Sequence, residues 1–150
     1  MAESSLFFLS LLTPEGDLSA LDETSIFARS VGTAGDDAIS LKQVKINLGQ
    51  AGMSVSDYEI VHTPEVLDAY GDPAYAAMRQ TGDGSVVLGD SGRPLILISD
   101  LGLSSEENAV TSIFHEIHHV DSALGSGTVS SEAHAEAYGE LMYLKYFGTK

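Results

Sequence analysis

Apolar residues recur every three or four positions in the last third of the chain, which is the spacing of one face of an α-helix. This apolar stripe consists of Val110, Ile113, Ile117, Val120 and Leu124. Ser104 and Glu107 precede it as a capping box, with Ser104 as the N-cap, and the glycines of residues 125–127 follow it. The pattern predicts a helix that ends near Leu124.

A second helix is predicted directly after this one. Ser130 or Ser131 can cap it, and it runs to about Phe147. Because the connection between the two segments is short, we expect an antiparallel helix pair.

The first half of the chain predicts packing elements. Residues 5–12 form an apolar run typical of a buried strand, and Leu18–Arg29 is a predicted helix. A further helix is capped by Asp36 or Asp37 and ends near residues 49–52. Its apolar positions are Leu41, Val44 and Leu48.

The middle of the chain alternates short strand signals with turns. Tyr58–His62 is a predicted strand, Pro64 can open a short helix toward Tyr70 and Gly71, and the stretch after Pro73 that holds Tyr75 and Met78 is predicted to be helical or irregular.

A hairpin is predicted before the first helix of the pair. It joins Ser85–Leu88 to Leu95–Ser99 through a polar loop. Two interpretations of the second strand stay open: a sheet edge to which a peptide substrate adds itself, or a plain core strand.

Composition indicates one globular domain over residues 1–150, with 43% hydrophobic and 19% charged residues. We expect an α+β fold with a small, mainly antiparallel or mixed sheet packed on helices. The apolar run near the N-terminus is too short to span a bilayer, and Glu3 stands where a signal peptide carries basic residues, so neither a transmembrane segment nor a signal peptide is expected. A cytoplasmic location fits these features.

The formal net charge of −15 disfavours nucleic acid and anionic membranes as partners. It suits a neutral or basic protein partner, or simply a soluble surface. The chain has no cysteine, so a zinc site must be built from imidazoles and carboxylates.

His115-Glu116-Ile117-His118-His119 reads H-E-x-x-H, the helical motif of zinc-assisted hydrolysis. On a helix, His115 and His119 share one face, opposite the apolar stripe, and can reach one Zn²⁺. Glu116 lies beside them, where it can act as general base on the attacking water. The competing interpretation is an ordinary polar helix face without metal.

A catalytic zinc needs a third protein ligand, and the last helix offers Glu132, Glu136, Glu140 and His134. Counting residues on either side of a turn at Leu124 places Glu136 level with His119, which makes Glu136 the preferred ligand. Glu132 is the alternative, although the helix dipole alone can explain an acidic residue in the first turn.

Other side chains have roles that depend on this choice. If Glu136 binds the metal, Glu140 can accept a hydrogen bond from a ligand imidazole; if Glu132 does, Glu136 takes that role. Tyr143 is a candidate oxyanion donor, with core packing as the alternative. His118 is either a substrate contact or solvated. His62 and His134 are lone histidines, interpreted as ordinary core or surface residues.

With its glutamates on the following helix, the motif resembles the gluzincins, zinc peptidases whose third ligand is a glutamate on the next helix. The metzincin pattern fails, because Ser122 and Gly125 occupy its glycine and third-histidine positions. The last sixty or so residues also resemble the small metallopeptidase domains of bacterial polymorphic toxins and secreted effectors. This resemblance implies a minimal zincin-like core, delivery to a target cell by a secretion system, and a cognate immunity protein.

The sequence therefore predicts zinc-dependent hydrolysis of a protein or peptide substrate, with Glu116 as the base. The alternative function is an acidic binding protein, such as an immunity protein, an inhibitor or a nucleic-acid mimic, whose histidines are vestigial or structural.

Overall fold

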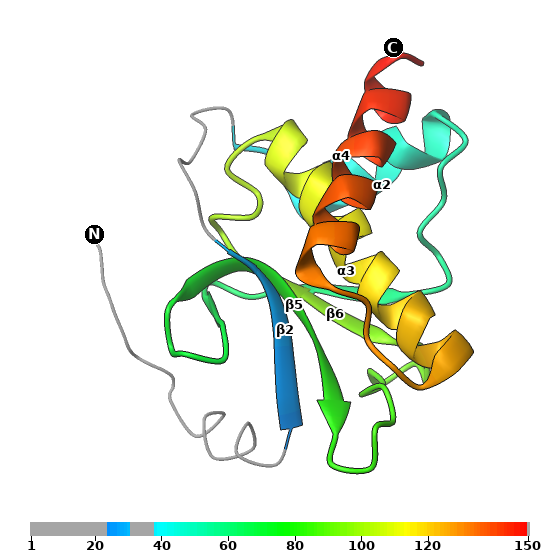
Figure 1. The fold of residues 1–150 in the computed structure, drawn as a ribbon. Coiled ribbons are helices and arrows are strands. Elements are labelled where there is room, and N and C mark those ends of the chain that lie inside the picture. Colours follow the sequence, from blue (N-terminus) through cyan, green and yellow to red (C-terminus); the bar gives the residue numbers. More distant parts are fainter. Residues whose placement is uncertain (1–23, 31–37, 150) are drawn as a thin grey trace.

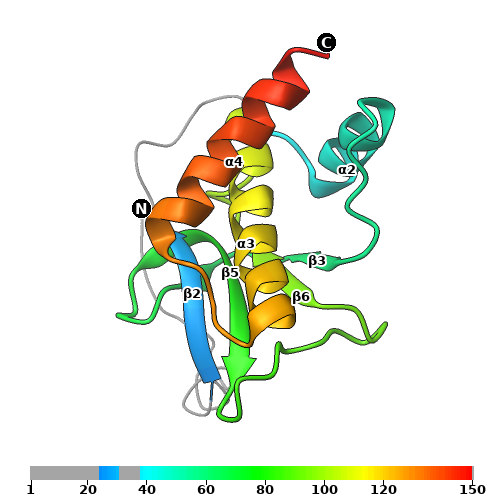
Figure 2. The ribbon, with the colours of Figure 1, turned by 45° about the vertical axis from the view of Figure 1, so that its right-hand side comes forward.

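The computed structural model describes the backbone of residues 24–30 and all of residues 38–149. It is an α+β structure in which a small mixed sheet carries helices, as the sequence predicts. Helices α3 (Glu106–Ser126) and α4 (Glu132–Phe147) lie side by side over the sheet, and α2 (Leu41–Gln50) flanks them (Figures 1 and 2). Within these ranges no helix is both long and apolar enough to cross a membrane.

The sheet is built around β5 (Pro73–Thr81). One edge of β5 pairs antiparallel with β2 (Thr24–Ser30), and the other pairs antiparallel with β4 (Val66–Leu67) and β6 (Leu95–Ile98). β3 (Glu59–His62) pairs parallel with the far edge of β6. β6 therefore has a neighbour on both sides and is a core strand, so its interpretation as a free edge for substrate is wrong.

A predicted helix and a stretch predicted to be helical or irregular are strands in the structure. The helix predicted over Leu18–Arg29 is wrong from residue 24 onward, because the β-branched and aromatic residues of β2 pair with β5 from Thr24↔Thr81 to Ser30↔Ala74. The helical or irregular stretch predicted after Pro73 is likewise wrong, since β5 is paired on both edges. The predicted strand over residues 5–12 and the caps Asp36 and Asp37 lie outside the described residues.

The short helix predicted after Pro64 is also replaced. The Asp68 carboxylate accepts hydrogen bonds from the backbone N–H groups of Tyr70 (2.8 Å) and Asp72 (2.9 Å), which turns the chain instead of continuing a helix. Gly71 has φ 85°, a conformation suited to glycine. The chain can then enter β5 directly.

The remaining predictions hold with small shifts. β3 and α2 are confirmed, with Ser40 as the cap of α2. In the predicted hairpin, β6 is confirmed, whereas residues 85–88 form isolated bridges rather than a strand. Ser105, one residue later than predicted, caps α3 by accepting from the backbone N–H of Asn108 at 3.1 Å.

The core lies between the sheet and α3. Ile96, Ile98 and Met78 of the sheet pack against the α3 stripe, and Val44 and Leu48 of α2 close one side. Four of the five stripe residues are buried, while Leu124 is 60% exposed. The middle of α3 is buried on the histidine face as well, because α4 covers it.

Candidate metal centre

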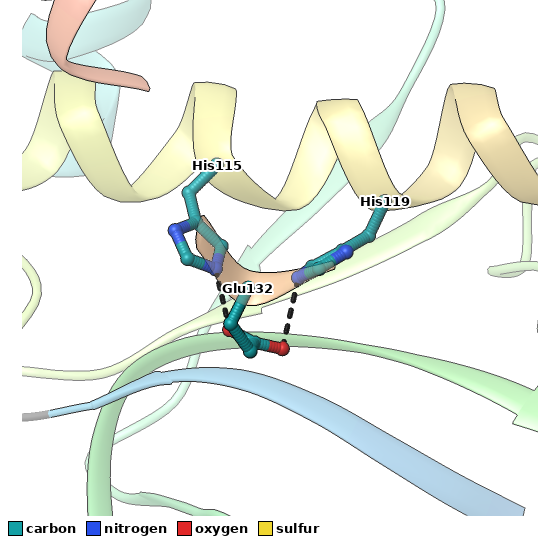
Figure 3. A group of neighbouring side chains, drawn as sticks. All are labelled: His115, His119 and Glu132. Atoms are coloured by element: carbon teal, nitrogen blue, oxygen red, sulfur yellow. Dashed lines mark hydrogen bonds and ion pairs between the residues drawn. The ribbon is translucent and has the colours of Figure 1, made fainter. Parts of the chain in front are cut away.

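His115 and His119 lie one turn apart on α3, and their ring centroids are 4.9 Å apart. Both side chains are buried, with 2% and 0% exposure. Their Nε2 atoms face a single carboxylate, that of Glu132: His115 Nε2 lies 2.9 Å from Oε1, and His119 Nε2 lies 3.1 Å from Oε2 (Figure 3). One glutamate thus bridges the two histidines of the motif.

Glu132 reaches this position because the connection between the helices is not a tight turn. α3 continues to Ser126 and is capped by Gly127 at φ 78°, and α4 begins at Glu132. The linking residues return along α3, so that Ser130 already contacts His119. The residue count that favours Glu136 assumes that the chain turns back along α3 only where α4 begins. Because the chain turns back earlier, the count selects a residue about one turn too far along α4.

Glu136 lies on the other side of the same histidine. Its Oε1 is 2.8 Å from His115 Nδ1, so His115 is held at both ring nitrogens by carboxylates of α4. The geometry therefore favours Glu132, the alternative from the sequence, as third ligand and gives Glu136 the orienting role. Glu140, the other candidate for that role, is exposed.

The carboxylates dominate the electrostatics of the group. Burial alone would lower the pKa of His115, but hydrogen bonds to Glu132 and Glu136, with the charge of Glu116, raise it to about 9. Burial likewise opposes ionisation of Glu132, but its hydrogen bonds to His115 and His119 lower its pKa to about 2. At neutral pH and without metal, both shifts favour an ion pair of protonated His115 with ionised Glu132.

Glu116 is fully buried beside this group. Its Oε2 is 3.9 Å from His115 Nε2, the same atom that faces Glu132. The structure thus places the carboxylate of the predicted base close to Nε2 of the predicted ligand His115, the nitrogen that also contacts Glu132.

A serine completes the surroundings of the motif. Ser130 Oγ lies 3.2 Å from His119 Nδ1 and 2.7 Å from His118 Nδ1. His118 also packs on Tyr138, with ring centroids 5.1 Å apart, and burial lowers its pKa. The sequence pattern predicts Ser130 only as a possible helix cap, and no local signal identifies this serine as a neighbour of the histidines.

Gly139 determines how closely α4 approaches the motif. A Cβ built at this buried glycine would lie 2.5 Å from the carbonyl oxygen of Thr111 and 3.3 Å from the backbone nitrogen of His115. α4 therefore rests on the α3 backbone at the level of the site. The helical sequence pattern does not distinguish this glycine, which a close helix contact requires, from a glycine that a helix merely tolerates.

The other candidate residues lie away from the group. Tyr143 is about three turns further along α4 than Glu132 and packs with Tyr146 and Phe147, which favours core packing over an oxyanion role. His62 is 2.6 Å from Asp100 at the end of β3, and His134 is exposed.

The donor set suits zinc. Among the described residues, His115, His119 and Glu132 form the one group of three metal-ligating side chains, with ligand atoms within 4.8 Å of one another. Two imidazole nitrogens and one carboxylate are the ligands of a catalytic zinc site, whereas Ca²⁺ and Mg²⁺ prefer oxygen alone. The Glu132 side chain is 56% exposed, so the group opens to solvent on that side.

The chain matches no model of a protein family, no characterised protein and no solved structure. Its function must therefore be argued from the site itself.

Proposed function

We propose that the protein is a zinc-dependent peptidase in which His115, His119 and Glu132 hold the ion and Glu116 is the general base. The observation that carries the proposal is the convergence of both Nε2 atoms on Glu132, with the buried Glu116 carboxylate 3.9 Å from His115 Nε2. Two consecutive helices, α3 and α4, thus bring two imidazoles and a carboxylate together beside a buried acid.

Each side chain then has a chemical task. A zinc ion held by these residues would polarise the substrate carbonyl and lower the pKa of the attacking water. Glu116 accepts the proton of that water and donates it to the leaving amine. Its burial limits loss of that proton to solvent. Glu136 keeps His115 oriented through Nδ1.

The resemblance to gluzincins and to the metallopeptidase domains of bacterial toxins supports a protein or peptide substrate. We extend the proposal to a toxin or effector that is delivered to a target cell and neutralised by an immunity protein. The net charge of −15 favours a basic surface on such a partner.

The same charge favours a second candidate function, an acidic protein that binds a basic partner without catalysis. Metal content discriminates between the two. Elemental analysis of the purified protein should find about one zinc per chain for the peptidase and none for the binding protein.

Catalysis is tested by incubating the zinc-loaded protein with a cell lysate and mapping new peptide termini. Glu116→Gln is the matched control, because the amide is isosteric but cannot take up a proton at neutral pH. New termini are expected with the wild type and not with the variant, while both bind zinc. A variant as active as the wild type would refute the mechanism.

A further inference from the structure

One hydroxyl, that of Ser130, lies between two histidines of the motif. Its Oγ is within hydrogen-bond distance of the Nδ1 atoms of His118 (2.7 Å) and His119 (3.2 Å). The proposed function uses His119 as a ligand but gives no role to His118 or to Ser130.

The number of protons determines the direction of these bonds. A neutral imidazole has one N–H and one acceptor nitrogen, and a hydroxyl has one proton to donate. His119 can bind a metal through Nε2 only when its proton is on Nδ1. That N–H then donates to Ser130 Oγ, and the hydroxyl donates its own proton to His118 Nδ1, the closer of the two nitrogens.

His118 is essential to this chain of bonds. Without an acceptor at His118, the hydroxyl can turn and donate to His119 Nδ1, which moves the His119 proton to Nε2 and blocks the metal position. His118 is held in place by Tyr138, 5.1 Å away between ring centroids.

The loop that carries Ser130 is fixed on both sides. Ser122 and Ser126 donate to the carbonyl oxygen of Thr128 at 2.8 and 3.3 Å. On the other side, Ser131 caps α4. The hydroxyl is thus positioned before any ligand binds, as an orienting group must be.

We propose that Ser130 and His118 are positioning residues that hold His119 in the tautomer whose Nε2 can bind zinc. This inference rests on the proposed zinc site. It gives His118, which is not one of the defining residues of the H-E-x-x-H motif, the same positioning role as Ser130.

The test is the zinc dissociation constant, measured by competition with a chromophoric chelator. Ser130→Ala should weaken binding about 10–100-fold, the usual effect of removing a group that orients a ligand, and Ser130→Thr should restore it. His118→Phe should weaken binding in the same direction, while His118→Asn, whose amide oxygen can accept in place of Nδ1, should not. Thr128→Ala is the matched control, because Thr128 lies on the same loop, its side chain is exposed, and its contacts with Ser122 and Ser126 are made by its main-chain carbonyl, which the substitution keeps.

Two further measurements separate positioning from general damage. The double variant Ser130→Ala/His118→Phe should bind zinc no more weakly than Ser130→Ala, because His118 acts only through the hydroxyl. In nitrogen NMR spectra of the zinc-loaded wild type, the His119 proton should be on Nδ1. Metal-free melting of each variant checks that it folds.

The outcomes are distinct. A wild type that binds no zinc refutes the proposed function. Tight zinc binding by the wild type together with unchanged affinity in Ser130→Ala overturns the positioning role alone, as would additive losses in the double variant. A proton on His119 Nε2 in the zinc-loaded protein would refute the proposed binding of zinc through that atom.

Discussion

Replacing Gly139 by alanine should both destabilise the protein and weaken its zinc site. The added methyl group would lie 2.5 Å from the carbonyl oxygen of Thr111 and 3.2 Å from its Cγ2. Because the oxygen belongs to the main chain of α3, it cannot rotate away. The two helices must therefore separate by about half an ångström before the contact becomes tolerable.

The magnitude follows from two opposing effects. Overpacking a close contact costs about 1–3 kcal/mol, whereas alanine is better than glycine in an unobstructed helix by up to about 1 kcal/mol. A net loss of about 1–2 kcal/mol lowers the melting temperature of a domain of this size by roughly 2–8 °C. The same separation would stretch the 2.8 Å contact between Glu136 and His115, so zinc affinity should fall about tenfold.

Thermal unfolding of the metal-free protein and zinc competition titration measure these two effects. Gly125→Ala is the matched control, because Gly125 is in α3 and nothing lies within 4 Å of its added Cβ. It should be neutral or stabilising by up to about 1 kcal/mol. If Gly139→Ala behaves like Gly125→Ala in both assays, α4 does not rest on α3 as described.

Three further predictions concern the ligands. In a chelator competition titration, Glu132→Ala should abolish tight zinc binding, Glu136→Ala should weaken it about 10–100-fold and Glu140→Ala should leave it unchanged. Retention of zinc by Glu132→Ala would exclude this glutamate as a ligand. His115→Ala should lose zinc. Chelator should therefore lower the melting temperature of the wild type but not of this variant, because zinc at 100 times its dissociation constant stabilises the native state by about 2.7 kcal/mol. In the metal-free protein the pKa of His115 is raised from 6.5 to about 9, so its stabilising contacts are fully present below pH 6.5 and are lost as the pH rises through 9. The urea midpoint should fall over that interval, and a midpoint that rises there would contradict the ion pair.

The helix pair could be predicted from the sequence because its signals are local. The apolar stripe of α3, the serine caps and the glycine at its end each act within a few residues. The α+β class and the positions of His115, Glu116 and His119 follow from the same local patterns. β5 could not be predicted, since Ala74, Ala76 and Ala77 have little strand preference and form a strand through pairing with β2 and β6.

The choice between Glu132 and Glu136 depends on tertiary structure. A residue count along two helices can rank them only if the path of the connection is known. Here the residues after Gly127 run back along α3, held by Ser122, and bring Ser130 to His119 before α4 begins. Gly139 then sets the distance between the helices. Neither effect has a periodic signature in the sequence.

The most direct test of the proposed metal centre is an anomalous difference map, recorded at the zinc absorption edge from crystals of the zinc-loaded protein. We expect a single peak for each chain, enclosed by His115 Nε2, His119 Nε2 and the Glu132 carboxylate, with Glu136 still on His115 Nδ1. No peak at this position, or a peak bound by Glu136 in place of Glu132, would contradict the site described above.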